Sequence, residues 1–301
     1  MHLSKYKLAI LALIFANIIW GAAFPIFKWS LENVPPYTFS FLRLFLASFL
    51  ILPFTMHKLT IKKQDIPDIL LLSFFGITIP ITAIFLGLLH APSINGPIIV
   101  SSGPIFLIIF AMLFLKEHPK KKVIFGTFVS LLGVLFVILR PAFEKELDSS
   151  ILGNVFFLAT TLGSVYHTIM VKKLTERYTV MTLTFWYLFL GSLPLLPLVA
   201  SEVQTTNFIQ HLNTQGLIGI GFGIIFSSFI AHLMYNFGVK QIHASEVGIF
   251  AYVDPLIAIL IAIPLLGEVL TPVFIIGTLL VFLGIFIAEG RLHYHPLHKL
   301  R

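Results

Sequence analysis

Two charged residues lie within long apolar segments, where a charge needs either a partner or a function. Arg43 stands well inside the apolar run 36–56, and Asp254 precedes Pro255 near the middle of the run 244–266. An arginine in hydrocarbon costs about 2.5–3.5 kcal/mol on insertion scales. Arg43 could anchor a substrate carboxylate or phosphate, but we favour an internal contact that holds its helix. Asp254 could carry a proton, contact an amine, or bond nearby hydroxyls.

Other polar side chains stand inside apolar runs and could contact a solute. Asn17 and Trp20 are three residues apart, so they share one face of a helix. Histidine titrates near neutral pH, so His167 and His232 could relay protons, although an internal hydrogen bond is the simpler role. Further candidates for substrate contact are Asn95, Ser101, Tyr166, Tyr235 and Tyr252.

These residues do not form the patterns of an enzyme or of a motor. The chain has no cysteine, which excludes disulfides, thiolate metal sites and cysteine nucleophiles. It has no His-Glu-x-x-His zinc motif and no glycine-rich nucleotide loop ending in Lys-Ser or Lys-Thr. The glycines of 219–223 lie in an apolar run and indicate close helix packing. We therefore predict no catalytic residue, no cofactor and no resident metal.

The composition indicates which elements must position these residues. Hydrophobic residues make up 57% of the chain and charged residues 11%, whereas soluble domains have about 25% charged residues. The sequence therefore predicts an all-α integral membrane protein in a lipid bilayer. Ten runs are long enough to span it, and they cover residues 8–29, 36–56, 66–89, 94–115, 122–139, 151–171, 180–200, 214–236, 244–266 and 272–289.

The positive charges predict the orientation of the chain. Sixteen of the 20 Lys and Arg residues fall in one set of ends and loops, and the opposite loops hold only Arg140 and Lys145. This asymmetry places both termini in the cytoplasm, and we expect a bacterial inner (plasma) membrane. The net charge of +7 lies in these short loops, so it does not indicate nucleic-acid binding.

An internal repeat links the two halves of the chain. Four residues of the first half, two glycines, a proline and a glutamate, each recur 151 residues later in the second half. Each half also holds five predicted spans. Because five is odd, the halves would insert in opposite orientations, which is an architecture of transporters. The repeat is faint in the first two spans of each half, where the best offset is 142. The pairs are Pro104 and Pro255, Glu117 and Glu268, Gly126 and Gly277, and Gly133 and Gly284.

The repeat also pairs positions near the predicted site. Asp254 corresponds to Gly103, so two proline-broken helices at matching depth could form a floor and a ceiling. Glu246 corresponds to Asn95, and such a pair could flank the two mouths of one pathway, but we favour a polar residue at the membrane interface without that role. Glu117 and its repeat partner each stand just before a helix, where a carboxylate stabilises the helix N-terminus. We expect that structural role for both.

The repeated pattern P-x12-E-x8-G-x6-G resembles the EamA-like domain of the drug/metabolite transporter (DMT) superfamily. The runs Asn17…Trp20-Gly21…Lys28 and Phe41-Leu42-Arg43 are similar to the family's N-terminal pattern. The resemblance implies ten transmembrane helices around a central cavity lined by helices 1, 3, 4, 6, 8 and 9. It implies two EamA-like repeats, residues 1–141 and 148–290, followed by a cytoplasmic tail, 291–301.

The leading functional hypothesis is a secondary transporter that moves a small organic solute by alternating access. The resemblance implies an exporter of an amino acid, a related metabolite or a drug. Proton coupling through Asp254, Glu246 or His232 and uncoupled facilitation are both open. The alternatives are an intramembrane enzyme acting on a lipid-like substrate, a channel and a sensor, none of which has a recognisable motif here.

Overall fold

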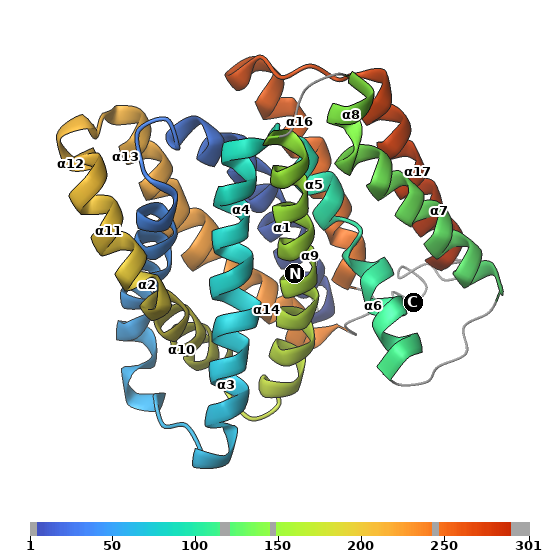
Figure 1. Ribbon diagram of the computed structural model, residues 1–301. Coiled ribbons are helices and arrows are strands. Elements are labelled where there is room, and N and C mark those ends of the chain that lie inside the picture. The colour runs from blue at the N-terminus through green and yellow to red at the C-terminus, as the bar shows by residue number, and fades with distance from the viewer. Residues whose placement is uncertain (1–4, 115–120, 145–148, 243–246, 290–301) are drawn as a thin grey trace.

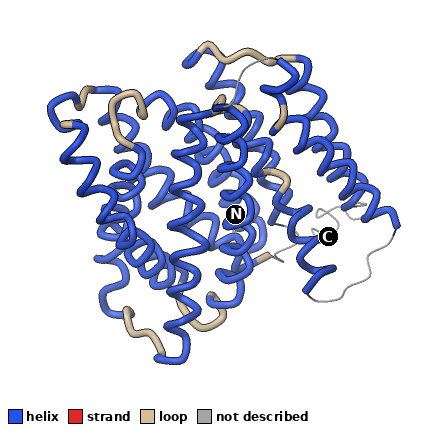
Figure 2. The backbone as a smooth tube through the Cα atoms, in the orientation of Figure 1, coloured by secondary structure: helices blue, strands red, loops and turns tan. Residues whose placement is uncertain are grey.

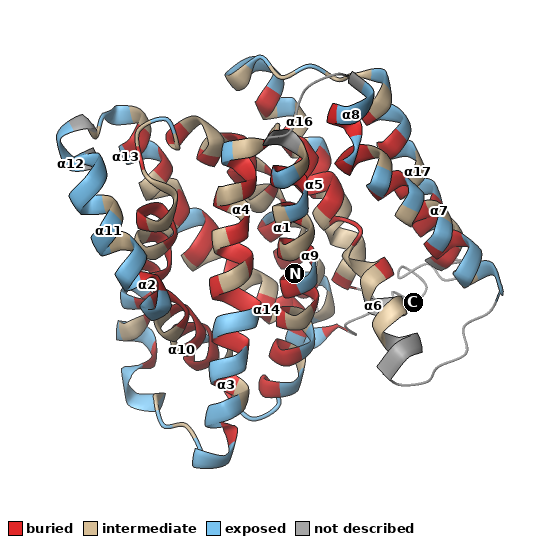
Figure 3. Cartoon of the chain, in the orientation of Figure 1, coloured by how far each residue is buried: buried red, intermediate tan, exposed pale blue. Residues whose placement is uncertain are grey.

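The computed structural model describes residues 5–114, 121–144, 149–242 and 247–289 (Figure 1). Helices connected by short loops make up this part of the chain, and no strand occurs within it (Figure 2). The predicted all-α fold is confirmed. Many large apolar side chains of the helices, such as Leu256, Leu260 and Leu279, are exposed, and exposed residues run along the outer helices (Figure 3). Such an apolar outer surface suits lipid and not water.

Several helices change type along their length and continue into the next helical segment. Two π-helical segments, Phe74–Thr78 and Phe222–Ile230, and a 3-10 segment, Gly248–Tyr252, continue neighbouring α-helices. The α-helices are α1 Lys5–Ser30, α2 Pro36–Thr55, α3 Ile66–Ser73, α4 Ile79–His90, α5 Asn95–Val100, α6 Gly103–Phe114, α7 Lys121–Ile138, α8 Arg140–Glu144, α9 Ser149–Leu174, α10 Val180–Ser192, α11 Leu196–Thr206, α12 Phe208–His211, α13 Thr214–Gly221, α14 Ala231–Gln241, α16 Val253–Leu266 and α17 Pro272–Glu289.

Eight helical runs in the described residues are long and apolar enough to cross a membrane. The run Pro272–Ala288 is apolar but shorter, and the predicted span 94–115 is divided into α5 and α6. These two segments remain predicted spans, as does the total of ten. The eight runs are Lys5–Ser30, Pro36–Lys58, Lys63–His90, Lys121–Ile138, Ile151–Leu174, Val180–Thr206, Thr214–Gln241 and Gly248–Leu266.

The helix breaks or changes type just before each of the two repeated prolines, Pro104 and Pro255. α5 ends at Val100 and α6 begins at Gly103, directly before Pro104. The 3-10 segment Gly248–Tyr252 gives way to α16 one residue before Asp254. Proline lacks a backbone N–H, and it is therefore tolerated in the first turn of a helix. Asp254 accordingly lies in the first turn of α16, where the helix dipole favours a carboxylate.

The four repeated glycines pack α7 against α17, which lie side by side at one edge of the molecule (Figure 1). A Cβ on Gly126 would lie 2.6 Å from the carbonyl oxygen of Gly284, and a Cβ on Gly284 would lie 2.6 Å from that of Gly126. Gly133 and Gly277 approach each other in the same reciprocal way. Small residues let two backbones meet where lipid offers no hydrophobic drive, so these glycines set the α7–α17 contact.

The first helix of each half packs against the other half of the chain. α1 packs along α13, α14 and α16, and we call these four helices the α1 group. α9 packs along α3, α4 and α5, and we call these four the α9 group. The two groups face each other across the middle of the molecule. A side chain that bonds across them therefore ties together two separately packed units.

Equivalent contacts in the two groups correct the offset predicted for the first spans. A Cβ on Gly87 would meet the ring of Phe157, and a Cβ on Gly238 would meet the side chain of Leu13. The two glycines are 151 residues apart, as the repeat predicts, while Leu13 and Phe157 are 144 residues apart. The predicted offset of 142 is therefore two residues short for α1 and α9.

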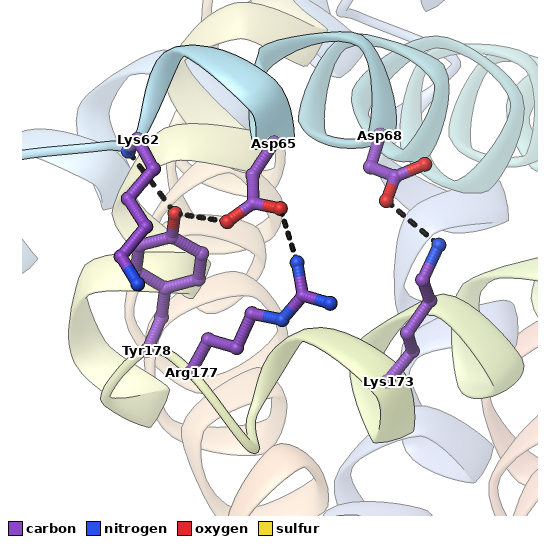
Figure 4. A network of polar contacts seen from close by, with 6 residues as sticks. All are labelled: Lys62, Asp65, Asp68, Lys173, Arg177 and Tyr178. Carbon is purple, nitrogen blue, oxygen red and sulfur yellow. Dashed lines mark hydrogen bonds and ion pairs between the residues drawn. The ribbon is translucent and has the colours of Figure 1, made fainter.

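A network of charged and phenolic side chains joins α3 to the end of α9 (Figure 4). The buried carboxylate of Asp65 accepts hydrogen bonds from Arg177 and, at 2.6 Å, from the hydroxyl of Tyr178. Burial raises the pKa of Tyr178, so its hydroxyl keeps the proton that it donates. Lys173 pairs with Asp68 at 2.7 Å. All these contacts lie within the α9 group and its loops, so they strengthen that unit.

Candidate functional site

A cavity with two adjoining lobes lies between the α1 group and the α9 group. Its lobes have volumes of about 110 and 130 Å³, well above the roughly 10–15 Å³ that one water needs. The residues that line both lobes come from both groups. They are Trp20, Val100, Ser164, Thr168, Tyr235 and Asp254.

Arg43 reaches the first lobe from α2 and is only 2% exposed. Its Nε donates to the hydroxyl of Ser228 and its Nη2 to the hydroxyl of Ser227, both at 2.9 Å. The guanidinium lies over the rings of Phe27, at 4.8 Å, and Phe85, at 5.7 Å. Its Nη1 has no hydrogen-bond partner among the described residues. The internal contacts that we favoured exist, but they leave one donor available to a ligand.

The π-helical segment Phe222–Ile230 supplies both hydroxyls that hold Arg43. π-helical geometry displaces the usual hydrogen-bond ladder and often occurs at functional sites. Here the carbonyl oxygen of Ser227 accepts from Trp20 Nε1 at 3.1 Å and contacts His232 Nδ1 at 2.9 Å. The segment therefore fixes Arg43, Trp20 and His232 around one serine.

Trp20 and Tyr235 form an aromatic wall that faces both lobes. Their ring centroids are 4.9 Å apart with a tilt of 53° between the ring planes. Tyr235 also shares a 2.8 Å hydrogen bond with Thr168, which fixes its hydroxyl across the two groups. Indole and phenol faces attract cations, so this wall suits an ammonium group.

Asp254 lines both lobes and is 3% exposed. Its Oδ1 has no hydrogen-bond partner, and no ion pair joins Asp254 to Arg43, in the part of the chain that the structure describes. Gly21 lets α1 pass directly over its backbone, because a Cβ there would lie 2.6 Å from the carbonyl oxygen of Asp254. A buried carboxylate without a partner costs free energy, so a cation or a proton at this position would stabilise it.

The second lobe is mainly apolar away from Asp254. Asn17 lies on its wall, but its amide nitrogen donates to the carbonyl oxygen of Leu13 at 2.7 Å. The remaining wall can receive an apolar part of a solute by excluding water from it. It includes Val100, Val165, Ile169, Val247 and Ala251.

His167 and His232 stand together beside the first lobe, with ring centroids 6.1 Å apart. His167 packs edge-on against Tyr187, and its Nε2 has no hydrogen-bond partner among the described residues. Asn236 donates to Tyr187 at 2.6 Å and to Thr184 at 2.8 Å. No group of three His, Asp or Glu side chains that could hold a metal occurs in the described ranges. These histidines therefore line the cavity as a pair of neighbouring rings.

Four of the predicted contact residues lie away from the cavity. Asn95 is buried and donates to Asn154 at 3.0 Å, and Ser101 bonds the carbonyl oxygen of Ile98. Tyr166 packs against Phe75, and Tyr252 against Phe282. Asn95 bonds between two helices and Ser101 bonds to its own helix, and sequence cannot distinguish either role from lining a cavity. Glu246 and Glu117 lie outside the described residues.

Glu268 stabilises a helix start, but not the one that the sequence suggested. Its two carboxylate oxygens accept from the backbone N–H groups of Ser93, at 2.6 Å, and Ile94, at 3.0 Å. These groups precede α5 in the first half of the chain, whereas we predicted the start of α17. Lys28 lies 3.3 Å from the same carboxylate. The prediction of a structural role held for the residue and was wrong about its partner.

Sequence reasoning missed the small hydroxyl residues of the site. Ser227 holds Arg43, and Ser164 and Thr168 line both lobes. Each stands in a long apolar run, where a hydroxyl side chain is unremarkable by itself. One signal could have drawn attention to Ser227. The repeat places Gly76 at the equivalent position, so the two halves differ there by a hydroxyl group.

Comparisons with known proteins agree on the family. The sequence profile of the EamA-like transporter family matches residues 7–139 and again 151–289. An uncharacterized transporter of Archaeoglobus fulgidus is 30% identical, over 89% of this chain and 94% of its own. A probable terminal-alkyne amino-acid exporter of Streptantibioticus cattleyicolor is 24% identical, over 97% of this chain and 95% of its own.

A solved crystal structure has a similar fold, with a TM-score of 0.66 at 14% identity, over 97% of this chain and 99% of the other. At that identity the likeness concerns the fold alone. The double match of the profile and the transporter relatives point to a membrane transporter rather than an enzyme. The chain, an all-helical membrane protein with a cavity between two packed groups, belongs to the EamA-like transporter family.

Proposed function

We propose that the protein is a secondary transporter that carries a small zwitterionic solute, such as an amino acid, through the cavity between the two groups. The observation that carries this proposal is the pair of opposite charges in one lobe. Arg43 offers a free Nη1 donor, and Asp254 has an unpartnered carboxylate oxygen, among the described residues. A ligand with both charges would satisfy both groups, whereas each alone is costly in a membrane interior.

Each group has chemistry suited to one end of such a ligand. A guanidinium binds carboxylates through directional N–H donors, and Ser227 and Ser228 hold the guanidinium of Arg43 in place. The ammonium end would bind Asp254 beside the aromatic wall of Trp20 and Tyr235. An apolar side chain of the solute would then occupy the second lobe. The relative named as a probable amino-acid exporter supports this choice of class.

Transport requires that the cavity open to one side of the membrane at a time. We propose that the α1 group and the α9 group rock against each other about the cavity. The tandem family match supports a duplicated architecture of the kind that alternates access. In this account both termini are cytoplasmic, the membrane is a bacterial inner membrane, and the physiological direction is export.

Asp254 also provides a means of coupling transport to protons. In the absence of solute its carboxylate would take up a proton instead of an ammonium group, because an unpaired buried charge is unfavourable. Exchange of solute for a proton at one site would then drive export with a proton gradient. Flux that rises with an imposed pH difference, and no longer does so in Asp254→Asn, is the expected result.

The test begins with thermal stabilisation of the purified protein by a panel of amino acids, nucleosides, sugars and cationic drugs. Any solute that stabilises the protein is then followed as saturable flux into proteoliposomes. The proposal predicts that amino acids stabilise it and are transported. Stabilisation only by cations or by uncharged solutes would contradict the zwitterionic site, and a bound solute that is chemically altered would favour an enzyme.

A further inference from the structure

Lys28, at the end of α1, reaches from the α1 group to the α9 group. Its Nζ donates to the carbonyl oxygen of Ala91 at 2.7 Å, in the connection between α4 and α5. The same Nζ lies 3.3 Å from Glu268, whose carboxylate accepts from the N–H groups at the start of α5. Lys28 of α1 and Glu268, which follows α16, therefore both hold the connection between α4 and α5.

Lys172, at the end of α9, makes the reverse connection. Its Nζ donates to the carbonyl oxygens of Val239 at 2.9 Å, Lys240 at 3.2 Å and Ile242 at 2.7 Å. These carbonyls belong to the C-terminal end of α14 and the residue that follows it. Lysine is well suited to this position, because a cation stabilises the carbonyl end of a helix.

The two contacts occupy equivalent places in the repeat. Lys28 and Lys172 are 144 residues apart, which is the offset that relates Leu13 to Phe157 in the same two helices. The acceptor of Lys28, Ala91, and one acceptor of Lys172, Ile242, are 151 residues apart, which is the offset of the rest of the repeat. In the predicted topology α1 ends outside and α9 ends in the cytoplasm. The lysines therefore fasten the two groups on opposite sides of the cavity.

We propose that Lys28 and Lys172 are a matched pair of gate residues, each closing one mouth of the cavity by fastening the two groups at that end. This inference rests on the proposed alternating access. When Lys28 releases Ala91 the cavity opens on the α1-end face, and when Lys172 releases the end of α14 it opens on the opposite face. The presence of both contacts describes a state in which both mouths are held.

Site-directed labelling tests the pair without knowledge of the solute. The chain contains no cysteine, so Ser164→Cys provides a single reporter in the wall of both lobes. A charged, membrane-impermeant methanethiosulfonate is added from one face or the other of oriented proteoliposomes. In this background Lys28→Met should speed labelling from the face predicted to be external about tenfold, and Lys172→Met should do so from the cytoplasmic face.

The adjacent residue gives a matched control. Lys173 is the next residue along α9 and is charged, but its partner Asp68 belongs to the same group. Lys173→Met should therefore leave the sidedness of labelling unchanged. Lys28→Arg, which keeps the charge and the donors, should return labelling toward the parent rate. Acceleration at the same face by both methionine variants, or at neither face, overturns the proposal.

A second variant guards against loss of folding. Glu268→Gln weakens the Lys28 contact from the other side while it keeps the size of the side chain. It should shift labelling in the same direction as Lys28→Met and by less. Unchanged sidedness in folded Glu268→Gln and Lys28→Met would contradict the gate. Because labelling needs no transported solute, this result is independent of the test of substrate class.

Discussion

The two halves of the cavity wall differ in chemistry at positions that the repeat makes equivalent. The positions in the first half are small or apolar, and those in the second half are polar or charged. At these positions the hydrogen-bonding side chain therefore comes from the second half of the chain. The equivalent pairs are Gly76 and Ser227, Ile81 and His232, Ile84 and Tyr235, and Gly103 and Asp254.

Other repeated positions kept the same residue in both halves. The glycines of α7 and α17 meet in reciprocal contacts, and the two prolines each stand in the first turn of a helix. Lys28 and Lys172 contact equivalent carbonyl oxygens. The residues that set backbone packing and fasten the groups are thus alike, while those that face the cavity differ. The repeated residues hold the helices together, and the residues that differ between the halves form the proposed solute site.

The largest effect should come from breaking a shared framework contact. In Gly133→Ala the new Cβ would lie 2.5 Å from the backbone nitrogen of Val281 and 2.6 Å from the carbonyl oxygen of Gly277. The backbones must move apart, at a cost of about 1–3 kcal/mol. We expect a lower yield and a lower melting temperature in detergent. Gly221→Ala, where a Cβ would meet nothing within 4 Å, is the control. Equal stability of the two variants would refute this account of the glycines.

The next largest effect should come from removing the charge that distinguishes the halves. Asp254→Asn should reduce flux by about tenfold to a hundredfold, because a charged hydrogen bond contributes about 1.5–3 kcal/mol. Folding should be retained, since the amide has nearly the same shape. Normal uptake with normal pH dependence in this variant would rule out a role for the carboxylate in binding or coupling.

Moving the carboxylate to the equivalent position sharpens the comparison. In Gly103→Asp the nearest neighbour of the new Cβ is Val165, at an ordinary contact distance of 3.5 Å. Combined with Asp254→Asn, this change places the charge at the start of α6, which lines only the second lobe, whereas Arg43 lines only the first. We expect flux to stay low. Recovery of flux in the double variant would mean that a carboxylate in either half suffices.

Arg43 gives a smaller and more selective effect. Arg43→Lys keeps the charge but cannot bond both serines and still present a planar donor. We expect the apparent KM for a solute with a carboxylate to rise about tenfold, while a matched solute without a carboxylate is unaffected. An equal change for both solutes, or loss of folded protein, would indicate that Arg43 only holds α2 in place.

The smallest effect should come from the serines that hold Arg43. Ser228→Ala removes one of the two hydroxyl contacts to the guanidinium, and the other, from Ser227, remains. A single hydrogen bond contributes about 0.5–1.5 kcal/mol, so the KM should rise about twofold to tenfold. Ser192→Ala, which removes a hydroxyl bonded to its own helix at Phe189, is the control. A change no larger than that of the control would contradict the positioning role.

The sequence predicted those features that depend on apolar length and on strict repetition. Long apolar runs predicted the helices. Proline, which lacks a backbone N–H, predicted where the broken helices begin. The repeat also indicated the importance of Glu268. It could not indicate that this carboxylate bonds the backbone before α5, in the first half of the chain. That contact depends on how helices of the two halves pack together, which is a tertiary feature.

The candidate site was only partly predictable for a related reason. Arg43 and Asp254 were recognisable because a charge in hydrocarbon needs an explanation. Asn95 and Ser101 have similarly placed polar side chains, but Asn95 bonds to Asn154 of α9 and Ser101 to its own helix. Ser227 became important only through a π-helical segment, which has no reliable signature in a single sequence.

The measurement that tests the central claim most directly is a binding cycle with blocked ligands. The tightest amino acid, its carboxamide and its N-acetyl derivative are titrated against the parent protein, Arg43→Gln and Asp254→Asn. We predict that the carboxamide binds more weakly to the parent but not to Arg43→Gln, and that the N-acetyl derivative binds more weakly to the parent but not to Asp254→Asn. Equal binding of all three ligands to the parent, or the same loss in every variant, would contradict a cavity built for a zwitterion.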